Sequence, residues 1–477
     1  MIILITILAY FGLLFTVGRL TSRRATNETF FRADRRSPWP LVAFGMVGAS
    51  ISGVTFVSVP GMVTTSQMTY LQLCLGFILG YAVVAFVLLP LYYRLNLTSI
   101  YTYLGHRLGR SAYLTGAWFF LLSKLTGAAV KFYVACIILQ RFLFQQFGVP
   151  FAAGVAAMVL LIWLYSRRGG IKTLVVTDSL NTLCLLTALL LIILHVVDNL
   201  GLTPAAAVSA VADSPLSRIF CFDAWQSPHY FWKQLLSGVF IVIVMTGLDQ
   251  DMMQKNLTCK TLRHAQKDML CYGMAFVPVN LLFLALGVLL TMTGTDASGD
   301  ALLPAYVEQA STLPHAALSA TVLQVLLVMG IVAASFSTAD SALTAMTTSF
   351  CVDICQRPAD EPLRRRSHGV MCLLFVAATL LFHAVNSRSL LDAVYTLVSY
   401  TYGPLLGLFA MAVLTRRRPQ PRWVPAVCIA SPLACLALSA AAASFWGYHF
   451  GYELLMLNGL LTFIGLYATS QSTAKPY

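Results

Sequence analysis

The chain has 477 residues, of which 58% are hydrophobic and 10% are charged, and its mean hydropathy is +0.78. These values exclude a soluble globular protein and predict an all-α polytopic membrane protein. The formal net charge of +13 would suit a nucleic acid partner only if the basic residues formed one surface. Their distribution along the chain, described below, gives no such surface, so we expect no nucleic acid partner.

Apolar runs of about 18 or more residues divide the chain into about thirteen predicted membrane spans. The predicted spans cover residues 1–19, 39–63, 68–93, 112–146, 151–166, 171–197, 230–250, 268–293, 316–350, 366–386, 389–414, 424–446 and 450–469. The first run has no basic residue before it and no clear small-residue cleavage site. We therefore expect it to stay in place as a helix rather than be removed as a signal peptide.

Basic residues mark one side of this arrangement. The loops that lie inside if the N-terminus is outside hold 25 of the 31 Lys and Arg residues. Because positive charge is retained on the cytoplasmic side, we expect the N-terminus outside and the C-terminus inside. The net charge of +13 then reflects the orientation of the chain in the membrane and does not indicate a charged partner. No connecting loop is long enough to fold alone, so we do not expect ATP-driven transport by this chain alone.

The stretch Phe44–Gly61, FGMVGASISGVTFVSVPG, is apolar enough for a membrane but is interrupted by small and hydroxylated residues. The interrupting residues are Gly48, Ser50, Ser52, Gly53, Thr55 and Ser58. Such a composition disfavours a continuous helix and favours one that is unwound within the bilayer. Backbone carbonyls freed by the break can bind a cation, and the hydroxyls can bind a solute.

Four of the ionisable residues inside the predicted spans matter most: Lys124, Lys131, Asp178 and Asp340. A charge at this depth is costly, which makes each residue a candidate for function. Simpler roles are also open. Asp178 can pair near the membrane interface, either lysine can extend its ammonium to a membrane edge, and the serines around Asp340 can pack helices together.

Five motifs in order resemble the sodium/solute symporters, the family of the sodium/glucose, sodium/proline and sodium/sialic acid carriers. The motifs are GASISG…VPG at 48–61, LTSIYTYLGHRLG at 97–109, RRGG…TD at 167–178, LDQDMMQKNL at 248–257 and SFSTADS at 335–341. The resemblance implies a leucine-transporter-type fold with two inverted five-helix repeats. These correspond to residues 39–197 and 230–414, joined by an outer loop at 198–229. Residues 1–38 and 415–477 would be additions.

The resemblance also implies a main sodium site between the broken helix and the ninth span. Its ligands would be the carbonyls of Gly48, Ile51 and Ala334 and the hydroxyls of Ser337 and Thr338. Some members bind a second sodium ion, for which the matching residues are Asp178, Ser337 and Ser341. Asp340 replaces a serine of those members, which leaves open whether this second site holds sodium, a proton or nothing.

For the solute, the matching positions are Ser52 and Thr55 on the broken helix and Gln72 on the next span. Lys124 is the candidate for a basic residue that the sialic acid carriers have as an arginine. The implied function is sodium-coupled import of a small organic solute by alternating access. An acidic sugar such as sialic acid, or another organic acid, is preferred as the solute.

Several alternatives remain at this stage. The solute could be a neutral sugar, an amino acid or a vitamin. The chain could also be a substrate-sensing membrane module or a passive channel. No nucleophile–base pair or metal cluster is evident, so we do not expect an enzyme. The expected location is the plasma membrane, in a bacterium the inner membrane, where a monomer in the lipid bilayer suffices, with one or two sodium ions as coupling ions.

Overall fold

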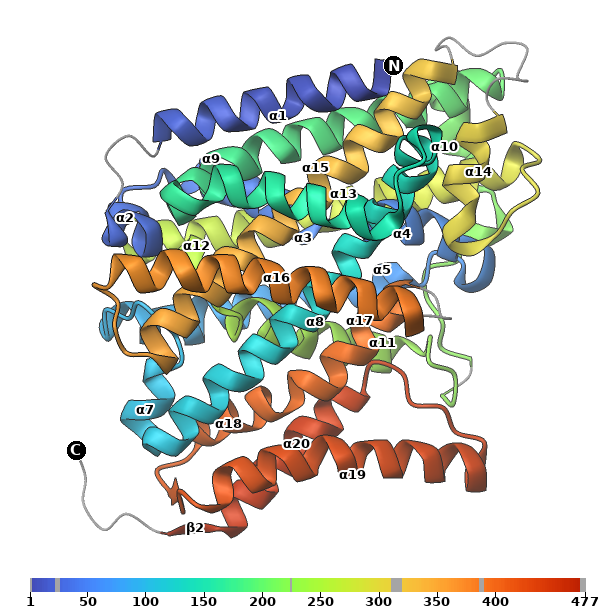
Figure 1. The fold of residues 1–477 in the computed structure, drawn as a ribbon. Helices are drawn as coiled ribbons and strands as arrows, with labels where there is room; N and C mark the ends of the chain where they lie inside the picture. The colour runs from blue at the N-terminus through green and yellow to red at the C-terminus, as the bar shows by residue number, and fades with distance from the viewer. Residues whose placement is uncertain (1, 22–25, 224, 310–319, 386–389, 472–477) are drawn as a thin grey trace.

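The computed structural model describes residues 2–21, 26–223, 225–309, 320–385 and 390–471 (Figure 1). Within these ranges the chain is almost entirely helical. The α-helices are α1 (Ile2–Thr21), α2 (Asn27–Arg32), α3 (Trp39–Ser50), α4 (Gly53–Ser66), α5 (Tyr70–Val83), α6 (Leu89–Arg94), α7 (Thr102–Leu108), α8 (Arg110–Phe142), α9 (Phe151–Asn199), α10 (Pro204–Ala212), α11 (Phe231–Val242), α12 (Gln250–Asn256), α13 (Leu262–Met292), α14 (Leu302–Gln309), α15 (Ala320–Ser349), α16 (Glu361–Val385), α17 (Leu390–Thr401), α18 (Gly403–Leu414), α19 (Trp423–Trp446) and α20 (Leu454–Ala468).

Shorter elements complete the chain. Segments of π-helix lie at Val84–Leu88, Ile243–Gly247 and Phe350–Ile354, and 3-10 turns lie at Ala33–Arg35, Phe144–Phe147, Pro215–Ser217 and Gly299–Ala301. Strands β1 (Arg418–Pro419) and β2 (Ser470–Gln471) form a two-residue antiparallel pair, which ties the segment before α19 to the segment after α20.

The predicted spans correspond to apolar helices. Among the described residues, eight helices are long and apolar enough to cross a membrane, and three bent helix pairs raise this number to eleven. Two shorter apolar helices, Phe151–Arg167 and Leu454–Ala468, lie at the two remaining predicted spans. Residues 316–319, 386 and 389, at the ends of three predicted spans, and residues 472–477 of the predicted tail lie outside the described residues.

The prediction that a span ends at residue 250 and is followed by an inner loop at 251–267 is wrong. The helix path breaks after Gly247 and resumes as α12, bent by 69°. All seven residues of α12 are buried, including Lys255. The cluster of charges misled the prediction, because lysines at this position were expected to face water.

The predicted spans 151–166 and 171–197 form one helical path, α9, with a kink at Gly170. The φ angle of Gly170 is +50°, in the region that favours glycine. An added Cβ would also lie 2.5 Å from the ring of Phe30. The kink therefore needs glycine both for its backbone angle and for its space.

The first and last helices flank the fold at opposite edges (Figure 1). Helix α1 lies along α9 on one edge, while α19 and α20 lie beyond α18 on the other. Between them, α9 and α15 pack against each other and against α3 and α8. The division of the chain into two inverted repeats and terminal additions remains a prediction.

Helices α5 and α11 approach each other closely at two glycines. A Cβ on Gly76 would lie 2.1 Å from the carbonyl oxygen of Leu235, and one on Gly238 would lie 2.2 Å from that of Leu73. Only residues without a side chain permit this spacing, as is common where membrane helices cross. The two helices are thus in direct backbone contact.

Candidate functional site

The predicted break in Phe44–Gly61 falls at Ile51 and Ser52, which have extended backbone angles between α3 and α4. The two helices are bent by 60°. In a continuous helix the Ser52 N–H would bond to the Gly48 carbonyl, but here it donates to Thr55 Oγ1 at 3.3 Å. The Gly48 carbonyl is therefore released from its helical partner, as a cation ligand requires.

Helix α15 meets the break with the residues that the sequence singled out. Thr338 Oγ1 donates to the carbonyl of Ala49 at 3.3 Å and to that of Ala334 at 3.1 Å. A Cβ on Gly53 would lie 2.3 Å from Ser335 Oγ, so the start of α4 rests directly on α15. The two halves of the predicted main sodium site thus lie together.

Gly48 also fixes the distance between α3 and α9. An added Cβ would lie 2.0 Å from Thr182 Oγ1, and that hydroxyl donates to the carbonyl of Phe44 at 3.0 Å. Ser179 makes the same kind of contact one turn earlier, to the carbonyl of Leu41 at 3.0 Å. Hydroxyls of α9 therefore hold the segment that precedes the break.

Asp178 is the centre of a buried polar cluster on α9. It accepts hydrogen bonds from Ser337 Oγ at 2.5 Å and from Ser341 Oγ at 3.5 Å. The ammonium of Lys255 lies 2.8 Å from its second oxygen. Asp340 belongs to the edge of this cluster and accepts from the Tyr165 hydroxyl at 2.5 Å. The structure thus gathers the four residues predicted for a second cation site, and adds a lysine.

A pocket with an empty volume of about 910 Å³, counting space open to solvent, lies beside the break. Its hydroxyl groups include those of Ser50, Ser52, Thr55 and Thr338. Its aromatic lining comes from Tyr70, Phe77, Tyr81, Tyr272, Phe276, Tyr395 and Tyr402. Such a lining, mostly aromatic with a few hydroxyl groups, suits a small organic molecule. Because Thr338 contacts both the break and the pocket, the two sites share a wall.

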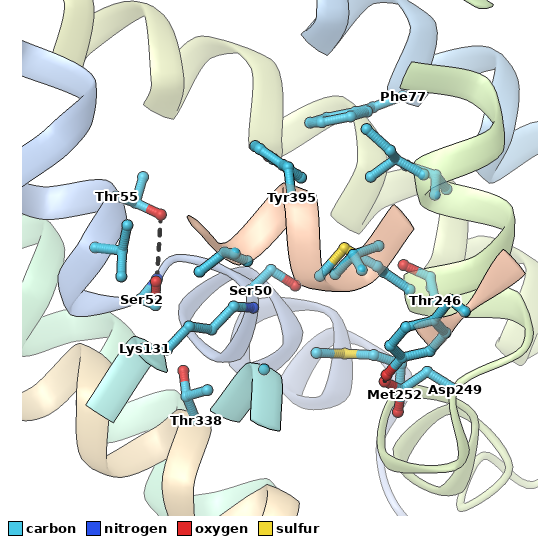
Figure 2. A pocket seen from close by; sticks show the side chains of 18 of the residues that line it. Ser50, Ser52, Thr55, Phe77, Lys131, Thr246, Asp249, Met252, Thr338 and Tyr395 are labelled. Carbon is cyan, nitrogen blue, oxygen red and sulfur yellow. Dashed lines mark hydrogen bonds between the residues drawn. The ribbon is translucent and has the colours of Figure 1, made fainter. Parts of the chain in front are cut away.

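The two lysines of α8 differ in their surroundings. Lys124 lines the pocket, but its ammonium lies 3.1 Å from Asp249 and 2.7 Å from Asp251. Lys131 is half-buried and has no ion-pair partner among the described residues. Figure 2 shows its side chain reaching into the pocket, with the nitrogen turned toward Ser50. Lys131 therefore carries the uncompensated positive charge.

Gln72 is not among the residues that line the pocket, and its contact with the solute remains a prediction. Its side chain is fully buried, and its amide group bonds to the connection between α9 and α11. Nε2 donates to the carbonyl of His229 at 3.0 Å, and Oε1 accepts from the N–H of Cys221 at 3.0 Å. Gln72 therefore anchors the loop at 198–229 over the helices.

Sequence reasoning missed Asp249, Asp251, Lys255 and Tyr402. Tyr402 donates to Asp249 at 2.6 Å, and Asp249 caps the start of α12 through the N–H of Asp251 at 2.8 Å. A signal was present, because Asp251 and Lys255 have the i, i+4 spacing of a helical ion pair. The pair lies where the sequence predicts the end of a span, so it is predicted to belong to an inner loop.

Known proteins that are similar in sequence to this chain are sodium-coupled carriers. The model of the Sodium:solute symporter family matches residues 30–420. The sodium/sialic acid symporter NanT of Aliivibrio fischeri is 25% identical, over 96% of this chain and 92% of its own. The human sodium/iodide cotransporter is 23% identical, over 83% of this chain and 62% of its own.

A solved structure is also similar along the whole length. It shows a Na⁺-coupled sialic acid symporter in a substrate-bound outward-open state. The TM-score is 0.79 and the identity 19%, and the match covers 98% of this chain and 97% of that one. At this identity the likeness concerns the fold, which is that of an all-helical membrane transporter.

Proposed function

Because the chain belongs to the sodium:solute symporter family, we propose that it imports a small organic anion together with sodium. The solute is an acidic sugar of the sialic acid type or another organic acid. Sialic acid and iodide, the solutes named for the two relatives, are both anions. The protein is an integral membrane protein, and its similarity to a bacterial carrier supports the inner membrane as its location.

The single observation that supports an anionic solute is that Lys131 reaches into the pocket and has no ion-pair partner among the described residues. A half-buried ammonium without a partner is costly, and a solute carboxylate in the pocket would supply the missing charge. Lys124 cannot do so equally well, because two aspartates already balance it. Ser52 and Thr55, which line the same pocket, would add hydrogen bonds to the solute.

Sodium is proposed to bind where α15 meets the break. The donor set suits a hard cation, because it consists of carbonyl and hydroxyl oxygens. The proposed ligands are the carbonyls of Gly48, Ile51 and Ala334 and the hydroxyls of Ser337 and Thr338. The Ser337 hydroxyl donates its hydrogen bond to Asp178, which leaves its oxygen lone pairs available for the ion.

In this proposal, the wall shared by the sodium site and the pocket couples the binding of sodium to the binding of the solute. Thr338 contacts the Ala49 carbonyl at the break and also faces the solute pocket. Sodium that fixes Thr338 and the break therefore completes the pocket, and a bound solute in turn strengthens sodium binding, since such coupling is reciprocal. The inward sodium gradient supplies the work, and the membrane potential adds about 2.3 kcal/mol at 100 mV only for each net charge that is moved.

The test is uptake of radiolabelled sialic acid into proteoliposomes under an inward sodium gradient, with monocarboxylates and neutral sugars as competitors. Concentrative uptake that requires sodium and is blocked by acids is expected. Lys131→Gln should raise the half-saturating concentration about 10- to 100-fold, because a charged hydrogen bond contributes about 1.5–3 kcal/mol. Lys260→Gln removes an exposed lysine and should leave uptake unchanged.

Two results would contradict the proposal. Uptake that equilibrates without concentrating the solute would indicate a passive channel. Competition by neutral sugars alone, together with unchanged uptake by Lys131→Gln, would show that the pocket does not select for negative charge.

A further inference from the structure

Lys255 is a fully buried lysine that the proposed transport mechanism does not use. Its side chain is only 2% exposed at the end of α12. The ammonium lies 2.8 Å from Asp178 Oδ2 and 3.8 Å from Asp251 Oδ1. Two carboxylates on different helices therefore hold one ammonium inside the protein.

The group that Lys255 contacts is the carboxylate predicted for a second sodium ion. Ser337 and Ser341 point their hydroxyls at the same carboxylate. One carboxylate with two hydroxyls is a donor set for a single cation. A sodium ion on these oxygens would lie within a few ångströms of the ammonium, and like charges repel strongly in a medium of low dielectric constant. The residues present therefore do not fit a sodium ion beside Lys255.

We propose that the Lys255 ammonium permanently replaces a second sodium ion, so that the protein binds one sodium ion in each cycle. The inference rests on the sodium coupling proposed above. Asp251 supports this proposal. It contacts Lys124 at 2.7 Å as well as Lys255, so it connects the Lys255 ammonium to the wall of the pocket. The positive charge stays in the protein instead of crossing the membrane with the solute.

The experiment counts sodium ions bound at equilibrium to the purified full-length protein. Radiolabelled sodium is titrated at constant ionic strength, with choline as the replacement cation. The wild-type protein should bind one ion per chain. Lys255→Met frees Asp178 and should bind two, while Lys255→Arg and the exposed-site control Lys260→Met should bind one. Adding Ser341→Ala to Lys255→Met should reduce the second binding event and return the count toward one.

The outcomes separate the two proposals. Two ions per wild-type chain, or one ion in a folded Lys255→Met protein, would overturn the replacement by lysine. If Lys255→Met does not fold, the double variant Lys255→Met with Asp178→Asn is used, because it leaves no unpaired charge. The double variant and the wild type should then each bind one sodium ion. A wild-type chain that binds no sodium would refute the coupling itself.

Discussion

The hydroxyls of Ser337 and Thr338 have different tasks although they are adjacent on α15. Ser337 donates to Asp178, whereas Thr338 donates to the Ala49 carbonyl at the break. Replacing both by Ser337→Ala and Thr338→Val removes two of five proposed ligands. We expect at least a tenfold rise in the sodium concentration for half-maximal uptake, since about 1.4 kcal/mol corresponds to a factor of ten.

The control for this prediction is Thr379→Val. Thr379 is also buried, but it lies on α16, and its hydroxyl donates within its own helix, to the carbonyl of Phe375 at 2.9 Å. Uptake with an unchanged sodium dependence in the double variant, at normal abundance in the membrane, would disprove the assignment of the main site.

Gly48 allows a second prediction about a single position. A Cβ there would lie 2.0 Å from Thr182 Oγ1, so Gly48→Ala must push α3 away from α9. We expect a loss of about 1–3 kcal/mol in unfolding free energy, as for other overpacked sites. The stabilisation by sodium should shrink too. Gly12→Ala is the matched control, because nothing lies within 4 Å of its Cβ position. Thermal unfolding in sodium and in potassium chloride measures both effects.

At the scale of elements, the two breaks in the helices differ in how well they can be predicted from the sequence. The first follows from the glycines and hydroxyls around Ile51 and Ser52. The second, between Gly247 and Gln250, is preceded by an apolar helix and followed by charges, a pattern typical of a helix that leaves the membrane. Only packing against Asp178 and Lys124 shows that these charges point inward, and such long-range pairing is not readable from spacing along the chain.

The buried charges after the second break should contribute strongly to stability. Asp251 lies between two lysines, so Asp251→Asn leaves Lys124 and Lys255 with one partner fewer each. We expect a loss of about 3–5 kcal/mol in unfolding free energy, because removing one partner leaves buried charge uncompensated. Denaturation in detergent micelles measures this loss.

The matched control is an exposed ion pair. Lys172 and Asp34 are 3.2 Å apart, with side chains 46% and 38% exposed. Asp34→Asn should cost less than about 1 kcal/mol, because water and salt screen such pairs. Equal effects of the two substitutions would show that the charges at α12 are far better hydrated than their burial indicates.

At the scale of the whole molecule, orientation is a prediction from basic residues alone. It places Cys221 outside and Cys355 inside, and both are partly accessible. A membrane-impermeant maleimide should therefore label intact cells, and Cys221→Ser should abolish most of that signal. Cys355→Ser should change labelling only after the cells are permeabilised. The reverse pattern would mean that the chain is inverted.

Much of the architecture could be predicted, because long apolar runs and one interrupted helix leave few alternatives for a chain in lipid. The residues proposed to bind sodium could be selected equally readily, since Ser337 and Thr338 belong to a motif, and their role remains a prediction. The solute residues were harder to assign. Lys124 and Lys131 lie two helical turns apart on the same helix, and only Asp249 and Asp251, far away in sequence, distinguish the paired lysine from the available one.

The glycine contact between α5 and α11 limits how the protein can move. With Gly76 and Gly238 holding the two backbones together, neither helix can rotate or slide alone without steric overlap. The two helices should therefore travel as one rigid body when the pocket changes the side to which it opens. The bending must occur elsewhere, and residues 51–52 and 248–249 already have non-helical backbone angles. The break at residues 51–52, which frees a ligand for the proposed sodium site, would then also serve as a hinge, together with the break at 248–249.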